Sequence, residues 1–129
     1  MAESLRKMFE VSSRRFFEKS FLITGAGSLG KALTCELLKT ECQAIRLLDN
    51  SELALEGART LFDSSRVRLL LGDVRDADRL TMAMQGVDYV IATAAIKSVT
   101  INAENPIEAV DVNVNGVFVT IKEAMRMKL

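Results

Sequence analysis

The sequence predicts an α/β protein of the Rossmann type: a parallel sheet with helices on both faces, truncated after about four strands. Three observations predict this class. Short apolar segments alternate along the chain with longer segments of helical periodicity. The short segments are continuously apolar, as is typical of strands buried on both faces. A glycine-rich turn follows the first of them, and strands joined by helices pair in parallel through right-handed crossovers.

The first half of the chain predicts two strands and two helices. Residues 20–24 form a short apolar strand that ends in glycines, and a helix follows over about residues 28–41. Residues 44–48 form the second strand. Ser51 is a typical N-cap residue for a helix that continues to about residue 62.

The second half repeats the same alternation. Residues 66–71 form the third strand, and a short helix follows over residues 76–85, before a glycine. Residues 87–93 form the fourth strand. After a loop, a long helix covers residues 106–127, with a proline in its first turn, where proline is tolerated.

Residues 1–19 form a separate segment ahead of the Rossmann-type domain that we expect over residues 20–129. Their apolar side chains are spaced for an amphipathic helix that packs on the domain or at a dimer contact; a helix lying on a membrane surface is the less favoured alternative. These side chains are Leu5, Met8, Phe9, Phe16 and Phe17.

Composition excludes several classes of protein. The 129 residues are 49% hydrophobic and carry 17 basic and 17 acidic side chains, so no net field attracts nucleic acid or anionic lipid. No apolar run approaches the roughly 20 residues that a membrane span needs, and the N-terminus lacks the apolar centre of a secretory signal. We therefore expect a cytoplasmic protein. Two cysteines without any histidine predict neither a metal site nor a disulfide.

The strongest motif is TGAGSLG, which contains Gly25, Gly27 and Gly30 in a G-x-G-x-x-G pattern between the first strand and the first helix. One glycine permits the tight turn, one lets the backbone approach a pyrophosphate, and one lets helix and strand pack closely. The N–H groups at the start of that helix then face the phosphates. The pattern therefore predicts a dinucleotide site.

Acidic residues follow the second and third strands. Asp49 lies nineteen residues after Gly30, where a carboxylate accepts hydrogen bonds from the adenosine ribose and repels the extra phosphate of NADP. The alternative is that Asp49 only closes a turn before Ser51. Asp73 and Val74 lie beyond the third strand, where they can pair with adenine; here the alternative is an ordinary turn before a helix.

The order and spacing of five segments resemble the extended short-chain dehydrogenase/reductase superfamily, and within it the CapD-like nucleotide-sugar 4,6-dehydratases of polysaccharide biosynthesis. The segments are FLITGAGSLGKAL, LLDNSELAL, LLLGDVRD, VDYVIATAAIKSV and ENPIEAVDVNVNGV. The resemblance implies NAD as cofactor, with NADP as a second option that Asn50 and Ser51 can accommodate. It implies a UDP-linked amino sugar as substrate. It assigns the glycines and Asp49 to the dinucleotide and Asp73 with Val74 to adenine.

The same resemblance places the residues after the fourth strand along the cofactor cleft, with Lys97 towards the substrate side, and adds the asparagine of the following helix. The full set of expected cofactor-binding residues is Gly25, Gly27, Ser28, Leu29, Gly30, Asp49, Asn50, Asp73, Val74, Thr93, Ala94, Ala95, Lys97 and Asn113.

The chain departs from the family pattern in three ways. Its glycine loop is one residue shorter than the usual G-x-x-G-x-x-G, and Lys97-Ser98-Val99 replaces the usual Lys-His-Val. It also lacks the catalytic Tyr-x-x-x-Lys or Met-x-x-x-Lys: Tyr89, the only tyrosine, is followed four residues later by Thr93. Without that proton-transferring group we assign no catalytic residue.

Three functions remain open. The first is the NAD-binding portion of a nucleotide-sugar 4,6-dehydratase or epimerase, inactive alone and able to use a UDP-sugar only with a second segment. The second is a small NAD-binding sensor or one subunit of a split enzyme. The third is a Rossmann scaffold that binds no dinucleotide. A truncated sheet leaves an open strand edge and an uncovered helix face, so we expect a homo-oligomer or a partner protein.

Overall fold

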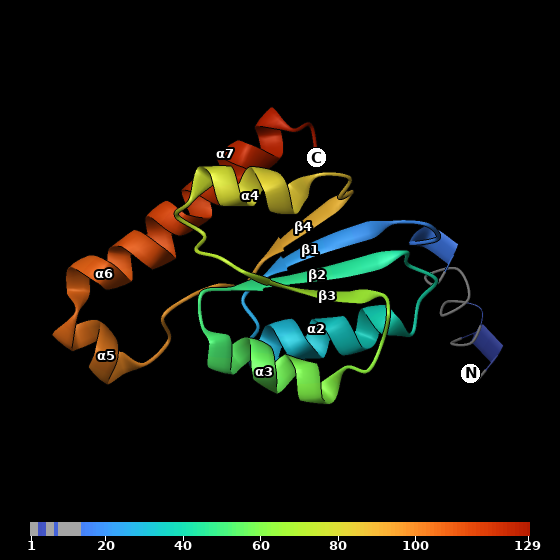
Figure 1. The fold of residues 1–129 in the computed structure, drawn as a ribbon, viewed down its shortest axis with the longest axis horizontal. Coiled ribbons are helices and arrows are strands. Elements are labelled where there is room, and N and C mark those ends of the chain that lie inside the picture. The colour runs from blue at the N-terminus through green and yellow to red at the C-terminus, as the bar shows by residue number, and fades with distance from the viewer. Residues whose placement is uncertain (1–2, 5–6, 8–13) are drawn as a thin grey trace.

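A computed structural model describes residues 3–4, 7 and 14–129 of the chain. Its centre is a sheet of four strands, all paired in parallel, in the order β3-β2-β1-β4 (Figure 1). The strands are β1 (Ser20–Thr24), β2 (Ala44–Asp49), β3 (Val67–Leu71) and β4 (Tyr89–Ala92). Because all four point the same way, their carboxyl ends meet at one edge of the sheet. The predicted Rossmann-type α/β fold is confirmed.

Helices cover both faces of this sheet (Figure 1). On one face, α2 (Ser28–Leu38) and α3 (Glu52–Leu61) pack over a core that contains Ile23, Ile45 and Leu47. On the other face, α4 (Ala77–Met84) and α7 (Gly116–Arg126) pack over Leu22, Leu48 and Leu80. All six of these side chains are fully buried. Alternate residues of β1 and β2 thus supply opposite cores, which explains the continuous apolar runs in the sequence.

Helix α2 ends at Leu38, three residues before the predicted end. The guanidinium of Arg66, which precedes β3, donates hydrogen bonds to the carbonyl oxygens of Leu38, Thr40 and Cys42. These contacts satisfy carbonyl groups that continued helix would otherwise have bonded. The N-cap prediction at Ser51 is confirmed, since its hydroxyl accepts from the Ala54 N–H at 3.2 Å.

The region after β4 contains more structure than predicted. The predicted loop holds a short helix, α5 (Val99–Glu104), whose N-cap Ser98 accepts from the Ile101 N–H. The predicted long helix has three parts: α6 (Pro106–Val110), a π-helical turn (Asp111–Asn115) and α7. Such π turns are rare and frequently occur at functional sites.

Most of the predicted amphipathic helix over residues 1–19 lies outside the described residues. Within the described part, the Phe16 ring packs edge-on against Phe21 and Tyr89 at centroid distances of 5.2 and 6.0 Å, while Phe17 is exposed. Cys35 and Cys42 are free thiols. In the described ranges, no helix combines the length and the apolar character needed to cross a bilayer.

Candidate functional site

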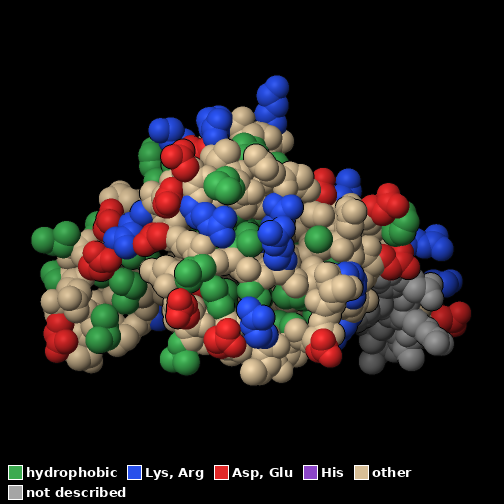
Figure 2. Space-filling view, in the orientation of Figure 1, with side chains coloured by type: hydrophobic (Ala, Val, Ile, Leu, Met, Phe, Trp, Pro, Cys, Tyr) green, Lys and Arg blue, Asp and Glu red, His purple; other side chains and the backbone are tan. Residues whose placement is uncertain are grey.

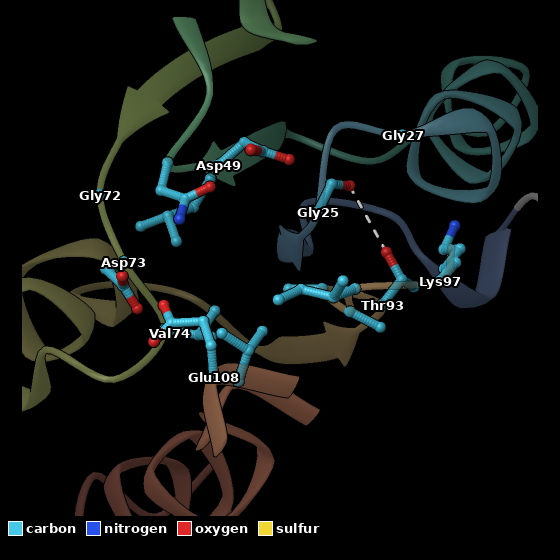
Figure 3. A pocket seen from close by; sticks show the side chains of 15 residues that line it. Gly25, Gly27, Asp49, Gly72, Asp73, Val74, Thr93, Lys97 and Glu108 are labelled. Atoms are coloured by element: carbon cyan, nitrogen blue, oxygen red, sulfur yellow. Dashed lines mark hydrogen bonds between the residues drawn. The ribbon is translucent and has the colours of Figure 1, made fainter. Parts of the chain in front are cut away.

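A pocket of about 180 Å³ lies at the carboxyl edge of the sheet, between the glycine loop and α6 (Figure 3). Its walls come from five places: the loop after β1, the ends of β2 and β3, the loop after β4, and α6 with the π turn. Ligands of open α/β sheets bind at this edge. The lining residues are Gly25, Gly27, Leu48, Asp49, Asn50, Gly72, Asp73, Val74, Thr93, Ala94, Ala95, Ile96, Lys97, Glu108 and Val112.

The glycine loop is shaped by two glycines that no other residue can replace without displacement. Gly25 has φ +97°, and a Cβ there would lie 2.8 Å from Thr93 Oγ1. A Cβ on Gly30 would overlap the carbonyl oxygen of Gly25. Both positions therefore need glycine for steric reasons. The Thr93 hydroxyl fastens β4 to this turn by donating to the Thr24 carbonyl at 2.7 Å.

Asp49 ends β2 with its carboxylate directed at the glycine loop (Figure 3). Oδ2 accepts the Ala26 N–H and Oδ1 accepts the Ser51 N–H, both at 2.8 Å. Asp49 therefore does close the turn before Ser51, as the alternative interpretation of the sequence predicted. Asp49 also lines the pocket, and because a carboxylate oxygen has two lone pairs, each oxygen can accept one further hydrogen bond.

Asp73 lies one residue beyond Gly72 at the end of β3, and its carboxylate is held by Arg75. Arg75 donates from its backbone N–H and Nε to Oδ1 at 2.9 and 3.0 Å, and from Nη2 to Oδ2 at 2.7 Å. The side-chain bonds from Arg75 hold the pKa of Asp73 below its usual range. Val74, which is buried, packs against Gly116, where a Cβ would come within 2.6 Å of Val74 Cγ2.

The loop after β4 is held by two asparagines, of which Asn102 in α5 donates to the Ile96 carbonyl at 3.0 Å. Asn113, in the π turn, accepts the Ile96 N–H at 2.8 Å and donates to the Ile96 carbonyl at 3.1 Å. Lys97 follows, with its ammonium 3.6 Å from the place where a side chain at Gly27 would begin (Figure 3). Among the described residues, Lys97 forms no ion pair. It presents a free positive charge beside the start of α2.

The structure places ten of the fourteen expected residues in one pocket and the other four outside its lining. Gly30 lies behind the glycine loop, where it lets α2 pack closely against the Gly25 carbonyl. Asn113 bonds the backbone of the loop after β4 and does not line the pocket. Sequence reasoning missed Leu48, Gly72, Ile96, Glu108 and Val112. Gly72 and Ile96 adjoin predicted residues. Glu108 and Val112 are four residues apart in a helical segment, a signal of a shared face but not of this pocket.

Tyr89 lies at the opposite end of the sheet. It is the first residue of β4, and its ring stacks on Phe21 with centroids 5.2 Å apart. Tyr89 therefore lies away from the carboxyl edge and contributes no group to the pocket.

A parallel sheet in the order 3-2-1-4, with a glycine turn and acidic residues meeting at its carboxyl edge, defines a Rossmann-type α/β protein. Within this class, the chain belongs to the polysaccharide biosynthesis protein family, whose model matches residues 21–129. The resemblance seen in the sequence segments is thereby confirmed.

Two curated relatives show how the chain relates to longer proteins. It is 42% identical over 119 residues to an uncharacterized membrane protein of Methanocaldococcus jannaschii, covering 92% of this chain and 36% of the relative. It is 40% identical over 103 residues to the UDP-N-acetylglucosamine 4,6-dehydratase (inverting) of Campylobacter jejuni, covering 78% of this chain and 31% of that protein. The chain thus spans about a third of the length of these relatives.

Solved structures share the same fold. The Pen protein of Bacillus thuringiensis matches with a TM-score of 0.83 and 35% identity, over 88% of this chain and 36% of that one. A dTDP-glucose 4,6-dehydratase from Streptomyces venezuelae, solved with NAD bound, matches with a TM-score of 0.78 and 24% identity, over 85% of this chain and 37% of that one.

Proposed function

We propose that this pocket binds the adenosine and pyrophosphate parts of NAD. The supporting observation is that the glycine loop, Asp49, Asp73 with Val74, and Lys97 line one pocket although they lie far apart in the sequence. At about 180 Å³, the pocket is smaller than the roughly 300–1,000 Å³ of typical ligand sites. The described residues therefore enclose only part of a dinucleotide.

Each group has a matching chemical task. Asp49 accepts from the ribose hydroxyls, and its negative charge disfavours the 2′-phosphate of NADP. Asp73 accepts from the adenine amino group, and the Val74 N–H donates to the ring. The start of α2 and the Lys97 ammonium face the pyrophosphate, because N–H groups and a free cation at a helix start attract phosphate. NAD, rather than NADP, is the cofactor that this set favours.

For the whole chain, we propose the cofactor-binding portion of a nucleotide-sugar dehydratase or epimerase, inactive by itself. This rests on family membership and on relatives named as a dehydratase and as UDP-glucose 4-epimerases, about three times as long as the chain. A UDP-sugar would bind only with a further segment. We also propose a cytoplasmic location, where free thiols such as those of Cys35 and Cys42 stay reduced.

A scaffold that binds no dinucleotide is the second candidate, and one contact favours it. The Ala26 N–H in the shortened loop already donates to Asp49 and so is not free for a phosphate oxygen. A stand-alone sensor or a split-enzyme subunit would use the same pocket as the first proposal, and only a partner protein would distinguish it.

Calorimetric titration with NAD and then NADP tests these proposals. We expect the chain to bind NAD more tightly than NADP, and Asp49→Ala to weaken NAD binding by about 10- to 100-fold, as for hydrogen bonds to a charged group. Asp49→Asn removes the negative charge and should reduce the ratio by which the chain binds NAD more tightly than NADP. Asp63→Asn, an exposed acid outside the pocket, is the matched control. Failure of the chain to bind either nucleotide would favour the scaffold.

We also propose that the chain pairs with a second copy through α6 and α7. Six apolar side chains recur every three or four residues along α6, the π turn and α7, and each is more than half exposed. Figure 2 shows acidic side chains over α5 and α6 with basic ones among them, and basic side chains near the end of α7 with acidic ones beside them. In an antiparallel pair, the acidic side chains near α6 of one copy would lie opposite the basic side chains near the end of α7 of the other. The stripe is Ile107, Val110, Val114, Phe118, Ile121 and Met125.

Light scattering during size-exclusion chromatography tests the pairing. We expect a dimer that Phe118→Glu converts to monomer, while Leu53→Glu, a substitution at an exposed leucine on α3, leaves it intact. A stable monomer of the unaltered chain at high concentration would contradict the proposal.

A further inference from the structure

Arg75 is the most heavily bonded side chain at the edge of the pocket, yet it does not line the pocket. It lies in the turn between β3 and α4 and forms ion pairs with Asp73, Glu108 and Asp111 at 2.7, 2.9 and 2.9 Å. Its side chain is 27% exposed. One guanidinium therefore connects the end of β3 to α6 and the π turn.

The bonds to Asp73 form a fork. Nε donates to one carboxylate oxygen and Nη2 to the other, which fixes the plane of the carboxylate as well as its position. The Arg75 backbone N–H gives Oδ1 a second donor, so both lone pairs of Oδ1 are occupied. Oδ2 receives one donor from Arg75, and its second lone pair is shared between the neighbouring Asn50 amide and the pocket. The acceptor that Asp73 offers to the pocket is therefore restricted to one atom in one orientation.

The remaining nitrogen, Nη1, contacts the helical side. It donates to Glu108 Oε1 and to Asp111 Oδ2, both at 2.9 Å. Asp111 begins the π turn that carries Asn113, the residue that holds the Ile96 backbone. These bonds of Nη1 form the helical arm of Arg75. By themselves they would only join two elements of the fold.

We propose that Arg75 is a positioning residue that makes the pocket selective for a base bearing an amino group, because it aims the free acceptor of Asp73 at that group. This inference rests on the proposed binding of NAD. Lysine would not replace Arg75, because its ammonium is a point charge without the planar fork. A base with a carbonyl in place of the amino group meets the same fixed acceptor and is repelled.

The test compares NAD with nicotinamide hypoxanthine dinucleotide, whose base carries a carbonyl in place of the amino group and a proton on the neighbouring ring nitrogen. Calorimetry gives the ratio of their dissociation constants for the unaltered chain, Arg75→Gln and Arg75→Lys. We expect the unaltered chain to prefer NAD by about 10- to 100-fold, the range for a hydrogen bond to a charged group. Both substitutions should reduce this preference, whereas the part that comes from the Val74 N–H, which cannot donate to a protonated ring nitrogen, should remain. Asp111→Asn, which weakens only the helical arm, should preserve it.

A second comparison connects the effect to Asp73. In an Asp73→Asn background, adding Arg75→Gln should leave the ratio unchanged, because the group that Arg75 positions is already altered. Thermal unfolding of each variant establishes that it is folded. If Arg75→Gln does not fold, the ratio of dissociation constants measured for Arg75→Lys, which retains the charge, decides the test.

The outcomes separate this inference from the proposed function. If Arg75→Gln weakens both nucleotides equally, or Arg75→Lys keeps the preference, Arg75 does not position Asp73 and the inference is wrong. If the unaltered chain binds both nucleotides equally well, the inference fails while dinucleotide binding stands. If it binds neither, the proposed function fails, and the inference fails with it.

Discussion

The two sides of the pocket reach the same edge of the sheet by different kinds of contact. The glycine wall, residues 24–30 with Asp49, is shaped by backbone: glycines that admit no Cβ, and a carboxylate bonded to the loop N–H. The helix wall, residues 72–75, 96 and 106–115, is held by side chains, with Arg75 and Asn113 making most of the bonds. The first wall therefore depends on sterics and the second on charge and hydrogen bonding.

The largest effect should come from a methyl group in the glycine wall. Gly30→Ala places a Cβ against the Gly25 carbonyl, backbone against backbone, so neither atom can rotate away. We expect a loss of about 3 kcal/mol or more in the free energy of unfolding, at the upper end for overpacking. Urea denaturation measures it.

Gly57→Ala in α3 is the matched control. A Cβ there meets only the far end of Lys31 at 3.8 Å, and alanine is the better helix former. We expect a gain of about 0.5–1 kcal/mol in the free energy of unfolding. Equal losses for both substitutions would show that Gly30 has no special steric role.

This contrast also explains what the sequence could predict. The glycine wall was predicted because its determinants lie within a few residues of each other, between a strand and a helix, and Asp49 falls at a fixed distance beyond them. The bonds of Arg75 to Glu108 and Asp111 join residues 33 and 36 positions apart. No local sequence pattern indicates contacts over this separation. The sequence analysis therefore predicted neither the role of Arg75 nor the π turn.

A hydrogen-bond deletion in the helix wall should have the next largest effect. Asn113→Ala removes its own two bonds to the Ile96 backbone, one donated and one accepted, and leaves the bond from Asn102 to the Ile96 carbonyl. We expect a loss of about 1–2 kcal/mol in the free energy of unfolding, as for two bonds to a partly buried peptide group. Amide exchange should accelerate in residues 93–98.

The glycine wall is the internal control for the amide exchange of Asn113→Ala. Its own bonds, such as that from the Ala26 N–H to Asp49, do not involve Asn113. Amide exchange at residues 24–30 should therefore stay close to that of the unaltered chain. Faster exchange across both walls would mean that they unfold as one unit, contrary to the comparison drawn above.

The smallest effect should be a pH dependence that belongs to the helix wall. Arg75 holds the pKa of Asp73 below its usual range, and Asn115 together with Arg75 does the same for the pKa of Asp111. A carboxyl group with a lowered folded pKa stabilises the fold at neutral pH. That contribution is lost as the pH falls below about 4, the ordinary carboxyl value, through the lower folded pKa.

Urea denaturation between neutral pH and about pH 3 tests the sign. The unaltered chain should lose stability in the acidic part of this range, and Arg75→Gln should lose less, because the parts of the Asp73 and Asp111 pKa shifts that come from Arg75 are removed. Gly57→Ala should follow the unaltered chain. A steeper acid loss in Arg75→Gln would contradict the assignment of these pKa shifts to Arg75.

The central claim, that a dinucleotide lies between the two walls, is tested most directly by mapping NAD onto the backbone amides by nuclear magnetic resonance. We predict that added NAD shifts the amide signals of residues 25–30 in the glycine wall, of Asp73 and Val74 in the helix wall, and of Thr93 to Lys97 in the loop that faces both. The hollow between the end of α3 and the start of β3, lined by Ser64 and Arg68, should not respond. Shifts confined to that hollow, or no shifts at saturating NAD, would contradict the account.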